Sequence, residues 1–337
     1  MNSVVAASRR KRTDRIITIV YLQILVSRTR AANGRTSLFR GSIGGSMHVP
    51  GSAGSAWRLM KDAIGPQRRD GAAVGAFLLA LARGSVGLAF QPVQAVAGRG
   101  GEVLYHEALT RQYGGGQWLP CGETMLAMER LGCIVWYDRL VLNTVIDLLE
   151  AHPGVRLGCN LSSLSLRLEL GWRAILARLR RNGSVARRLT LEITETAALQ
   201  DPDEALSIIA ALRRLACRVA IDDLGSGRTA LAFVRDCRPE VIKIDRSILA
   251  PAPGQAGENT ELLAAMVGLG TRLSPCVVVE GIDSEGLLRR AVGAGATAVQ
   301  GFFIAAPEMQ PGWLATPVRL RARRLHPAEA PGAEKAS

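Results

Sequence analysis

Acidic and amide side chains recur where short apolar runs of the chain end, and their types suit the binding of divalent cations. Carboxylate and amide oxygens are hard donors, which favour Mg²⁺ or Mn²⁺ over thiophilic metals. Carboxylates that converged on one site would repel one another unless cations lay between them. The candidates are Glu107, Asn160, Glu192, Glu195, Asp222, Asp223, Asp245, Glu280, Asp283 and Gln300, with Lys243 among them. These residues together predict a metal site.

The apolar runs that carry these residues have the length and the β-branched composition of buried strands. The runs are residues 103–105, 155–157, 189–191, 219–221, 241–242 and 277–279, and amphipathic stretches of helical length separate them. A helical segment at residues 72–83 leads into a strand at 88–93, after which we expect continuous alternation to about residue 309. About eight strand–helix units predict an α/β fold whose parallel strands close into a barrel, with the polar residues at one mouth.

The positive charge of the chain lies in its two ends. The 337 residues carry a formal net charge of +13, and residues 1–70 contain 13 Lys or Arg against three Asp. Residues 316–337 contain five Lys or Arg against two Glu, which leaves residues 71–315 close to neutral. We therefore expect one folded domain at 71–315 between a disordered basic leader or linker and a disordered tail, and no nucleic-acid-binding fold.

The leader and the cysteines bear on the cellular location. Residues 16–26 are apolar but too few to span a bilayer, so no transmembrane segment is expected. Three alternatives remain for this part of the chain: a signal-like region, a membrane-surface helix, or a mis-assigned start upstream of Met47. The six cysteines include no CxxC pair, and Cys159, Cys217 and Cys276 fall in or beside apolar runs, which predicts free thiols in a reducing cytoplasm.

The segment at residues 105–111, with its triplet Glu107–Ala108–Leu109, resembles the signature of the EAL domain family. Other motifs of that family follow in order over roughly residues 75–309. They are Phe90–Gln91–Pro92, Asn160–Leu161–Ser162, Glu192–Ile193–Thr194–Glu195, Asp222–Asp223–Leu224–Gly225–Ser226–Gly227, Lys243–Ile244–Asp245, Glu280–Gly281–Ile282–Asp283 and Gln300–Gly301. The triplet alone is uninformative, whereas the whole ordered set is highly specific.

The resemblance implies a modified (β/α)8 TIM-like barrel that hydrolyses cyclic di-GMP to linear pGpG with two Mg²⁺ or Mn²⁺ ions. It assigns one ion to Glu107, Asn160, Glu192 and Asp222, with Asp222 bridging to a second ion that Asp223 completes. Two divalent ions can acidify an attacking water and neutralise phosphoryl oxygens, so this chemistry fits the donors independently. The adjacent Asp pair must lie where its strand ends and turns, because neighbouring strand residues face opposite sides.

Lys243 is the strongest single candidate for catalysis. The chain contains four lysines against 38 arginines, and the other three lysines lie in the leader or the tail. A compact ammonium can contact a bound water or a phosphate oxygen more closely than a guanidinium can. With Lys243 we expect Asp245, Glu280 and Glu107 to be catalytic.

The resemblance also gives roles to the remaining motif residues. Gln91, Arg111 and Gln300 are expected to contact substrate, and Glu195 to anchor the loop after the Asp pair. Strand alternation points His106 away from the site.

Three departures from the family pattern bear on activity. Asp283 stands where Glu is usual, Leu224 where Phe is usual and Arg228 where Tyr is common. None of them removes a principal metal ligand.

Two other functions stay open at this point, along with the oligomeric state. The chain could be a non-catalytic cyclic di-GMP receptor that acts through a protein partner, or, on its basic ends alone, a nucleic-acid-binding protein. Because family members often pair through the loop after the Asp pair, a homodimer is a further hypothesis.

Overall fold

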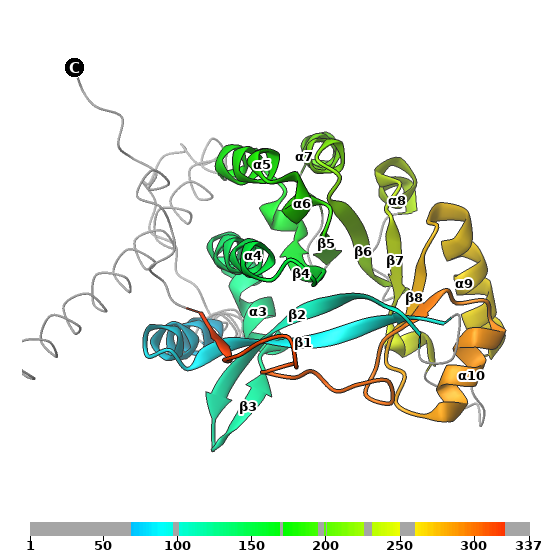
Figure 1. Cartoon of the computed structure of the whole chain (residues 1–337), viewed down its shortest axis with the longest axis horizontal. Helices are drawn as coiled ribbons and strands as arrows, with labels where there is room; N and C mark the ends of the chain where they lie inside the picture. Colours follow the sequence, from blue (N-terminus) through cyan, green and yellow to red (C-terminus); the bar gives the residue numbers. More distant parts are fainter. Residues whose placement is uncertain are drawn as a thin grey trace, which may run out of the picture.

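The computed structural model describes residues 69–96, 101–168, 171–194, 199, 201–225, 231–249 and 260–320. The structure is described for these residues alone, which Figure 1 draws in colour. Most of the basic leader, the tail from residue 321, Glu195 and the loop at 226–230 lie outside them. The disorder of both ends, the anchoring role of Glu195 and the pairing of two copies through the loop therefore stay predictions.

Strands and helices alternate along most of the described chain. A helix covers residues 69–82. The strands are β1 Val86–Ala95, β2 Val103–Gly114, β3 Gln117–Pro120, β4 Leu157–Ser162, β5 Leu189–Thr194, β6 Arg218–Leu224, β7 Val241–Ile244, β8 Val277–Val279, β9 Ala298–Val299 and β10 Val318–Arg319. The labelled helices are α3 Gly122–Arg130, α4 Ile134–Ala151, α5 Trp172–Arg181, α6 Gly183–Ala186, α7 Pro202–Arg214, α8 Leu231–Cys237, α9 Thr260–Leu273 and α10 Glu285–Gly293, with 3-10 turns η2 Ser163–Ser165 and η3 Arg246–Leu249. The predicted helix at 72–83 and all seven predicted strand runs fall in or overlap observed elements.

Eight of the described strands close into a barrel with helices outside it (Figure 1). The ring runs β1-β9-β8-β7-β6-β5-β4-β2 and closes through the β1–β2 pairing. Seven of these strands are parallel, which confirms the predicted TIM-like barrel. The predicted continuous alternation is wrong at its first step, because β1 is antiparallel to both β2 and β9. Only residues 96–102 join β1 to β2, and so short a connection suits antiparallel strands but not parallel ones.

Two apolar layers stabilise this barrel. The larger one lies between the strands and the outer helices, where α4 buries Leu140, Val145 and Ile146. The smaller one fills the inside of the ring with one side chain from each of six strands. These six residues, called the floor below, are Val93, Tyr105, Ala220, Val241, Val278 and Ala298. The floor closes the barrel beneath the polar mouth.

The folded body extends beyond the predicted boundary at residue 315. Strand β10 pairs with Gly87 and Leu88 of β1, and the side chain of Leu320 is fully buried. The predicted start of the tail at residue 316 is therefore too early. The two residues of β10 are too few to show the alternation of apolar and polar residues that marks a strand. No helix in the described part of the chain has the length and apolarity needed to cross a membrane. All six cysteines are free, as predicted.

Candidate functional site

The polar residues of the site stand one pleat above the floor. Side chains two positions apart on a strand face the same side, so each floor residue has a polar neighbour at the mouth. These neighbours are Glu107 on β2, Asp222 on β6, Lys243 on β7, Glu280 after β8 and Gln300 after β9. Because β1 runs the other way, Gln91 precedes its floor residue Val93 and pairs with Glu107. The barrel thus gathers residues that lie up to 209 positions apart.

Two further predicted residues join the mouth from the strands between β2 and β6. Asn160 on β4 and Glu192 on β5 are register partners. Asn160 donates its Nδ2 hydrogen to Glu107 Oε1 over 2.6 Å, and Gln300 Nε2 donates to Glu107 Oε2 over 2.7 Å. Gln300 also donates to Gln91 Oε1 over 3.3 Å. These amides orient Glu107 and link β1, β2, β4 and β9 at one level.

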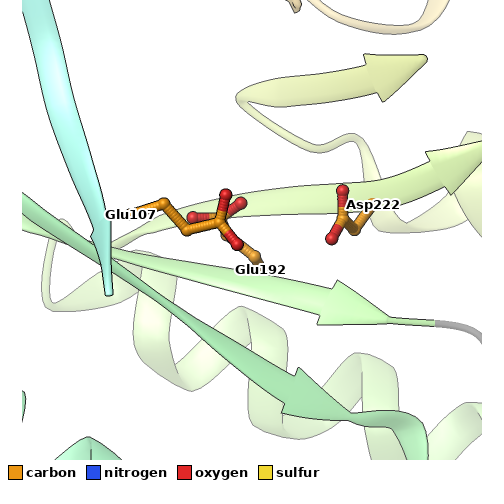
Figure 2. Close-up of side chains that lie close together, drawn as sticks. All are labelled: Glu107, Glu192 and Asp222. Atoms are coloured by element: carbon orange, nitrogen blue, oxygen red, sulfur yellow. The ribbon is translucent and has the colours of Figure 1, made fainter. Parts of the chain in front are cut away.

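The ammonium group of Lys243 lies at the centre of four carboxylates. Its Nζ is 3.0 Å from Glu107 Oε2, 2.7 Å from Glu192 Oε2, 3.2 Å from Asp222 Oδ1 and 2.6 Å from Glu280 Oε1. The Lys243 side chain is 1% exposed. Figure 2 shows the carboxylates of Glu107, Glu192 and Asp222 turned toward a common space from three different strands. A single positive charge therefore faces four negative ones.

The pKa shifts reflect this excess of negative charge. Burial alone would lower the pKa of Lys243, but the surrounding carboxylates hold that pKa well above its ordinary value. Burial, followed by the charge of Glu107, raises the pKa of Glu192 well above the usual range. Burial raises the pKa of Asp222, and that of Glu280 to about 8, despite the nearby ammonium. Burial would also raise the pKa of Glu107, but the charge of Lys243 and the hydrogen bonds that Glu107 accepts lower this pKa below its ordinary value. More positive charge would stabilise the cluster.

The oxygen atoms form two groups that could each hold a cation. Glu107, Glu192 and Asp222 offer oxygens within 4.8 Å of one another, and so do Asp222, Asp223 and Glu280. Asp222 belongs to both groups, as expected of a bridging ligand. Among the described residues, buried Asn160 Oδ1 and Glu192 Oε1 have no hydrogen-bond partner. Unpaired buried oxygens are costly, so these donors fit hard divalent cations.

The backbone turns at the Asp pair, as the sequence predicts. The pairing of β6 with β7 shifts register between Ile221 and Leu224, which lets both acids reach the mouth. Asp223 has a φ of 59° and Gly225 a φ of 104°. A Cβ on Gly225 would press on Ile248, so glycine suits both the backbone and the packing there. Burial and the charges of Asp222 and Asp245 raise the pKa of Asp223 to about 7.

Asp245 lines the cavity of the site, whereas Arg111 lies farther along β2. Asp245 makes no ion pair with Lys243; it interacts with Asp223 and accepts a hydrogen bond from Ser247 N over 2.8 Å. Arg111 follows Glu107 by four positions on β2, and its Nη1 donates to Thr110 O over 2.9 Å. Arg111 does not line the cavity of the site, so contact with substrate stays a prediction for it.

His106 lies outside the carboxylate cluster, as expected. Its ring is 5.8 Å from that of Trp313, centroid to centroid. Burial lowers its pKa.

Two residues that support the site were not found from the sequence. A Cβ on Gly158 would overlap Glu192 Oε1 and the ring of Tyr105, so this position of β4 must stay empty. An isolated glycine inside a strand signals such a close approach. Buried Asp138 on α4 accepts hydrogen bonds from Ser162 N over 2.9 Å and from Ser165 Oγ over 2.5 Å. It thereby fixes the end of β4 just beyond Asn160.

A cavity of about 370 Å³ opens above the carboxylates. Its inner wall is formed by cluster residues and by Gln91 and Gln300. Toward solvent, the exposed side chains of Arg246, Asp283 and Phe302 line it. Gly301 lies so close to Ile282 that a Cβ would overlap its backbone, which holds the segment before Phe302 against the rim. An exposed guanidinium and an exposed aromatic ring thus flank the cluster.

The family follows from a direct comparison of the sequence. Residues 75–307 match the family model described as EAL domain, which covers more than half of the chain. The chain belongs to the EAL domain family. The resemblance drawn from the motifs is therefore confirmed.

Named relatives place this domain within longer proteins. The bifunctional diguanylate cyclase/cyclic di-GMP phosphodiesterase MucR of Pseudomonas aeruginosa is 28% identical over 240 residues, which are 68% of this chain and 34% of that protein. The cyclic di-GMP phosphodiesterase NbdA of the same organism is 29% identical over 226 residues, or 65% of this chain and 28% of NbdA. The chain spans about a third or less of the curated relatives that it matches first.

Solved structures agree with the fold. The phosphodiesterase part of P. aeruginosa MucR, in complex with c-di-GMP, has a TM-score of 0.57 at 26% identity; the match covers 66% of this chain and 97% of that one. The EAL domain of FimX from P. aeruginosa, bound to c-di-GMP, has a TM-score of 0.56 at 28% identity, covering 70% and 96%. Both are EAL domains or phosphodiesterases that bind the dinucleotide.

Proposed function

We propose that this chain hydrolyses cyclic di-GMP to linear pGpG with two Mg²⁺ or Mn²⁺ ions, in the cytoplasm. The observation that carries the proposal is the pair of oxygen groups sharing Asp222 at the bottom of an open cavity. Names of relatives that include cyclic di-GMP phosphodiesterases support the substrate class. The free cysteines suit a reducing compartment.

The donors divide between two cation positions. Glu107, Asn160, Glu192 and Asp222 would hold one cation, and Asp222, Asp223 and Glu280 the other. Bound divalent ions supply a more acidic water and charge neutralisation at the phosphoryl oxygens. The chain's own amides keep Glu107 ionised and oriented, because Asn160 and Gln300 both donate to it.

The remaining residues of the cavity would bind and orient the dinucleotide. Lys243 lines the cavity and would offer its ammonium to a phosphate oxygen, and the neighbouring carboxylates raise its pKa and so keep it charged. Arg246 at the rim offers a second cation to the phosphates, and Phe302 offers an aromatic face to a base. Asp245, hydrogen-bonded to the backbone of η3, would orient a water beside Asp223.

The test is hydrolysis of cyclic di-GMP by the purified chain with Mg²⁺ or Mn²⁺, read as pGpG by chromatography. We expect Glu107→Ala and Lys243→Ala to lose at least about 10³-fold in rate, since each removes a central charge of the site. Arg289→Ala is the control, because Arg289 makes only an exposed pair with Glu285 on α10. Folded protein that yields no pGpG with either metal refutes the proposal, and tight binding without turnover identifies a receptor instead.

A further inference from the structure

A second cavity lies at the end of the barrel opposite the carboxylates. It has a volume of about 460 Å³ and forms where α7, α8 and α9 end and where β7 and β8 begin. Arg213, Arg235, Arg238 and Arg272 line it, with Glu240 as the acidic residue among its walls. Glu240 directly precedes β7, whereas Lys243 lies near the other end of that strand, and the two cavities share no residue.

The charge of this cavity is not cancelled by its surroundings. Glu240 is fully engaged, because Oε1 pairs with Arg213 over 2.7 Å and Oε2 accepts from Val219 N over 2.9 Å. Arg235 pairs with Asp236 over 2.8 Å at an exposed position. Within the described residues, Arg238 and Arg272 make no ion pair. Each of the three helix ends contributes about half a negative charge, so Glu240, Asp236 and the helix ends together offset most, but not all, of the four guanidinium charges.

The backbone at Arg238 determines where its side chain lies relative to the cavity. Arg238 follows α8 with a φ of 49°, in the left-handed region that glycine or asparagine adopts at lower cost. The residue also precedes Pro239, which restricts its backbone further. Ala216 has a similar φ of 64° just after the end of α7, so this conformation ends the helix and thereby fixes where the Arg238 side chain meets the cavity wall.

We propose that this cavity binds a small organic molecule that carries two or more phosphate groups. Planar guanidinium groups match phosphate oxygens in pairs, and the unpaired Arg238 and Arg272 provide two such groups. Leu273 and Pro275 supply apolar wall for an organic portion. The volume lies in the range of ordinary small-molecule sites. The site is distinct from the metal-dependent mouth and takes its ligand without a divalent cation.

The experiment is titration calorimetry of the full chain with inorganic pyrophosphate and with ADP, in EDTA and 150 mM salt. EDTA removes divalent ions, so the acidic mouth repels both probes. We expect saturable binding of both, tighter for ADP. Arg238→Gln and Arg272→Gln should each weaken it at least about tenfold, the factor that one charge-assisted hydrogen bond supplies.

The control removes equal charge from a comparable helix end. Arg180 and Arg181 are exposed in the last turn of α5. Arg180→Gln and Arg181→Gln should leave the affinities for pyrophosphate and for ADP unchanged. Arg238→Lys should retain part of the binding, and thermal unfolding shows whether each variant is folded. Wild-type protein that binds neither probe, equal losses in the α5 variants, or unchanged binding by the two cavity variants overturns the proposal. Pyrophosphate binding without a gain for ADP also overturns it, because the site then recognises charge alone. None of these outcomes depends on hydrolysis of cyclic di-GMP.

Discussion

The central position of Lys243 predicts how stability changes when its charge is removed. Lys243→Met keeps an unbranched side chain of similar length but leaves four carboxylates without their cation. At contacts of 2.6–3.2 Å, the ammonium is the nearest positive charge to each of them. Removing one partner of a buried ion pair costs about 3–5 kcal/mol, because the other partner stays buried and unpaired. We expect that loss in the metal-free protein at pH 8.

The loss should depend on pH, with a definite sign. Two charged carboxylates whose oxygens lie within 4.8 Å of each other repel by roughly 3.5 kcal/mol or more at an effective dielectric of 20. Folded carboxylates with raised pKa values, such as Glu280 at about 8, bind protons that the unfolded chain has released. Stability therefore falls as pH rises, by about 1.4 kcal/mol per pH unit for each such group. Without Lys243, more of these carboxylates have raised pKa values. The loss of stability caused by the substitution should therefore be smaller at pH 6 than at pH 8, by at least about 1 kcal/mol.

Urea unfolding in EDTA at pH 6 and pH 8 measures both effects. The midpoint of Lys243→Met should lie about 1–2 M below that of the wild type at pH 8. Arg178→Met is the control, because Arg178 pairs with the partly exposed Asp147 and Glu150, and such pairs contribute about 1 kcal/mol or less. Adding Mn²⁺ should restore much of the lost stability. An unchanged midpoint at pH 8, or an equal shift at both pH values, would refute the electrostatic reasoning.

Three further substitutions test other parts of the structure. Gly158→Ala should displace Glu192 and weaken Mn²⁺ binding roughly 10–100-fold by calorimetry, as loss of a supporting contact typically does. Asp138→Asn keeps the bond from Ser162 N but removes a carboxyl whose burial raises its pKa to about 7. That carboxyl lowers the stability of the wild type as the pH rises toward 7. Between pH 5 and pH 8 the free energy of unfolding, measured with urea, should therefore fall by about 2–3 kcal/mol less in the variant than in the wild type. Gly268→Ala on α9 meets open space and should raise stability by about 0.5–1 kcal/mol in the same assay, with unchanged Mn²⁺ binding.

The barrel and its polar mouth could be predicted because their signals are local. Each strand run is apolar and ends in a polar residue, and the scarcity of lysine singled out Lys243. The spacing of two between floor and mouth is a property of any strand, so Glu107, Asp222 and Glu280 had to share one level. The turn at the Asp pair followed from the same alternation together with Gly225.

Other features depend on contacts that no local pattern records. The reversed direction of β1 follows from its short link to β2. The apolar run of β1 itself does not reveal this, because it reads the same for either strand direction. The need for an empty space at Gly158 comes from Glu192, 34 positions later, and the support from Asp138 comes from a helix. Similarly, Arg111 shares a strand face with Glu107, yet its distance along β2 carries it past the cavity.

The reversed first strand also determines where the polypeptide joins the barrel. In an all-parallel barrel the first strand starts at the end away from the active site. Here β1 begins at Val86, opposite Gln112 and beyond the level of Glu107, and β10 leaves beside Gly87. The helix at 69–82 and β10 accordingly lie on the same side of the molecule (Figure 1). A module joined through the helix at 69–82 or through β10 would thus meet the barrel at the end that carries the polar mouth, and its signal need not cross the hydrophobic interior to reach the carboxylates.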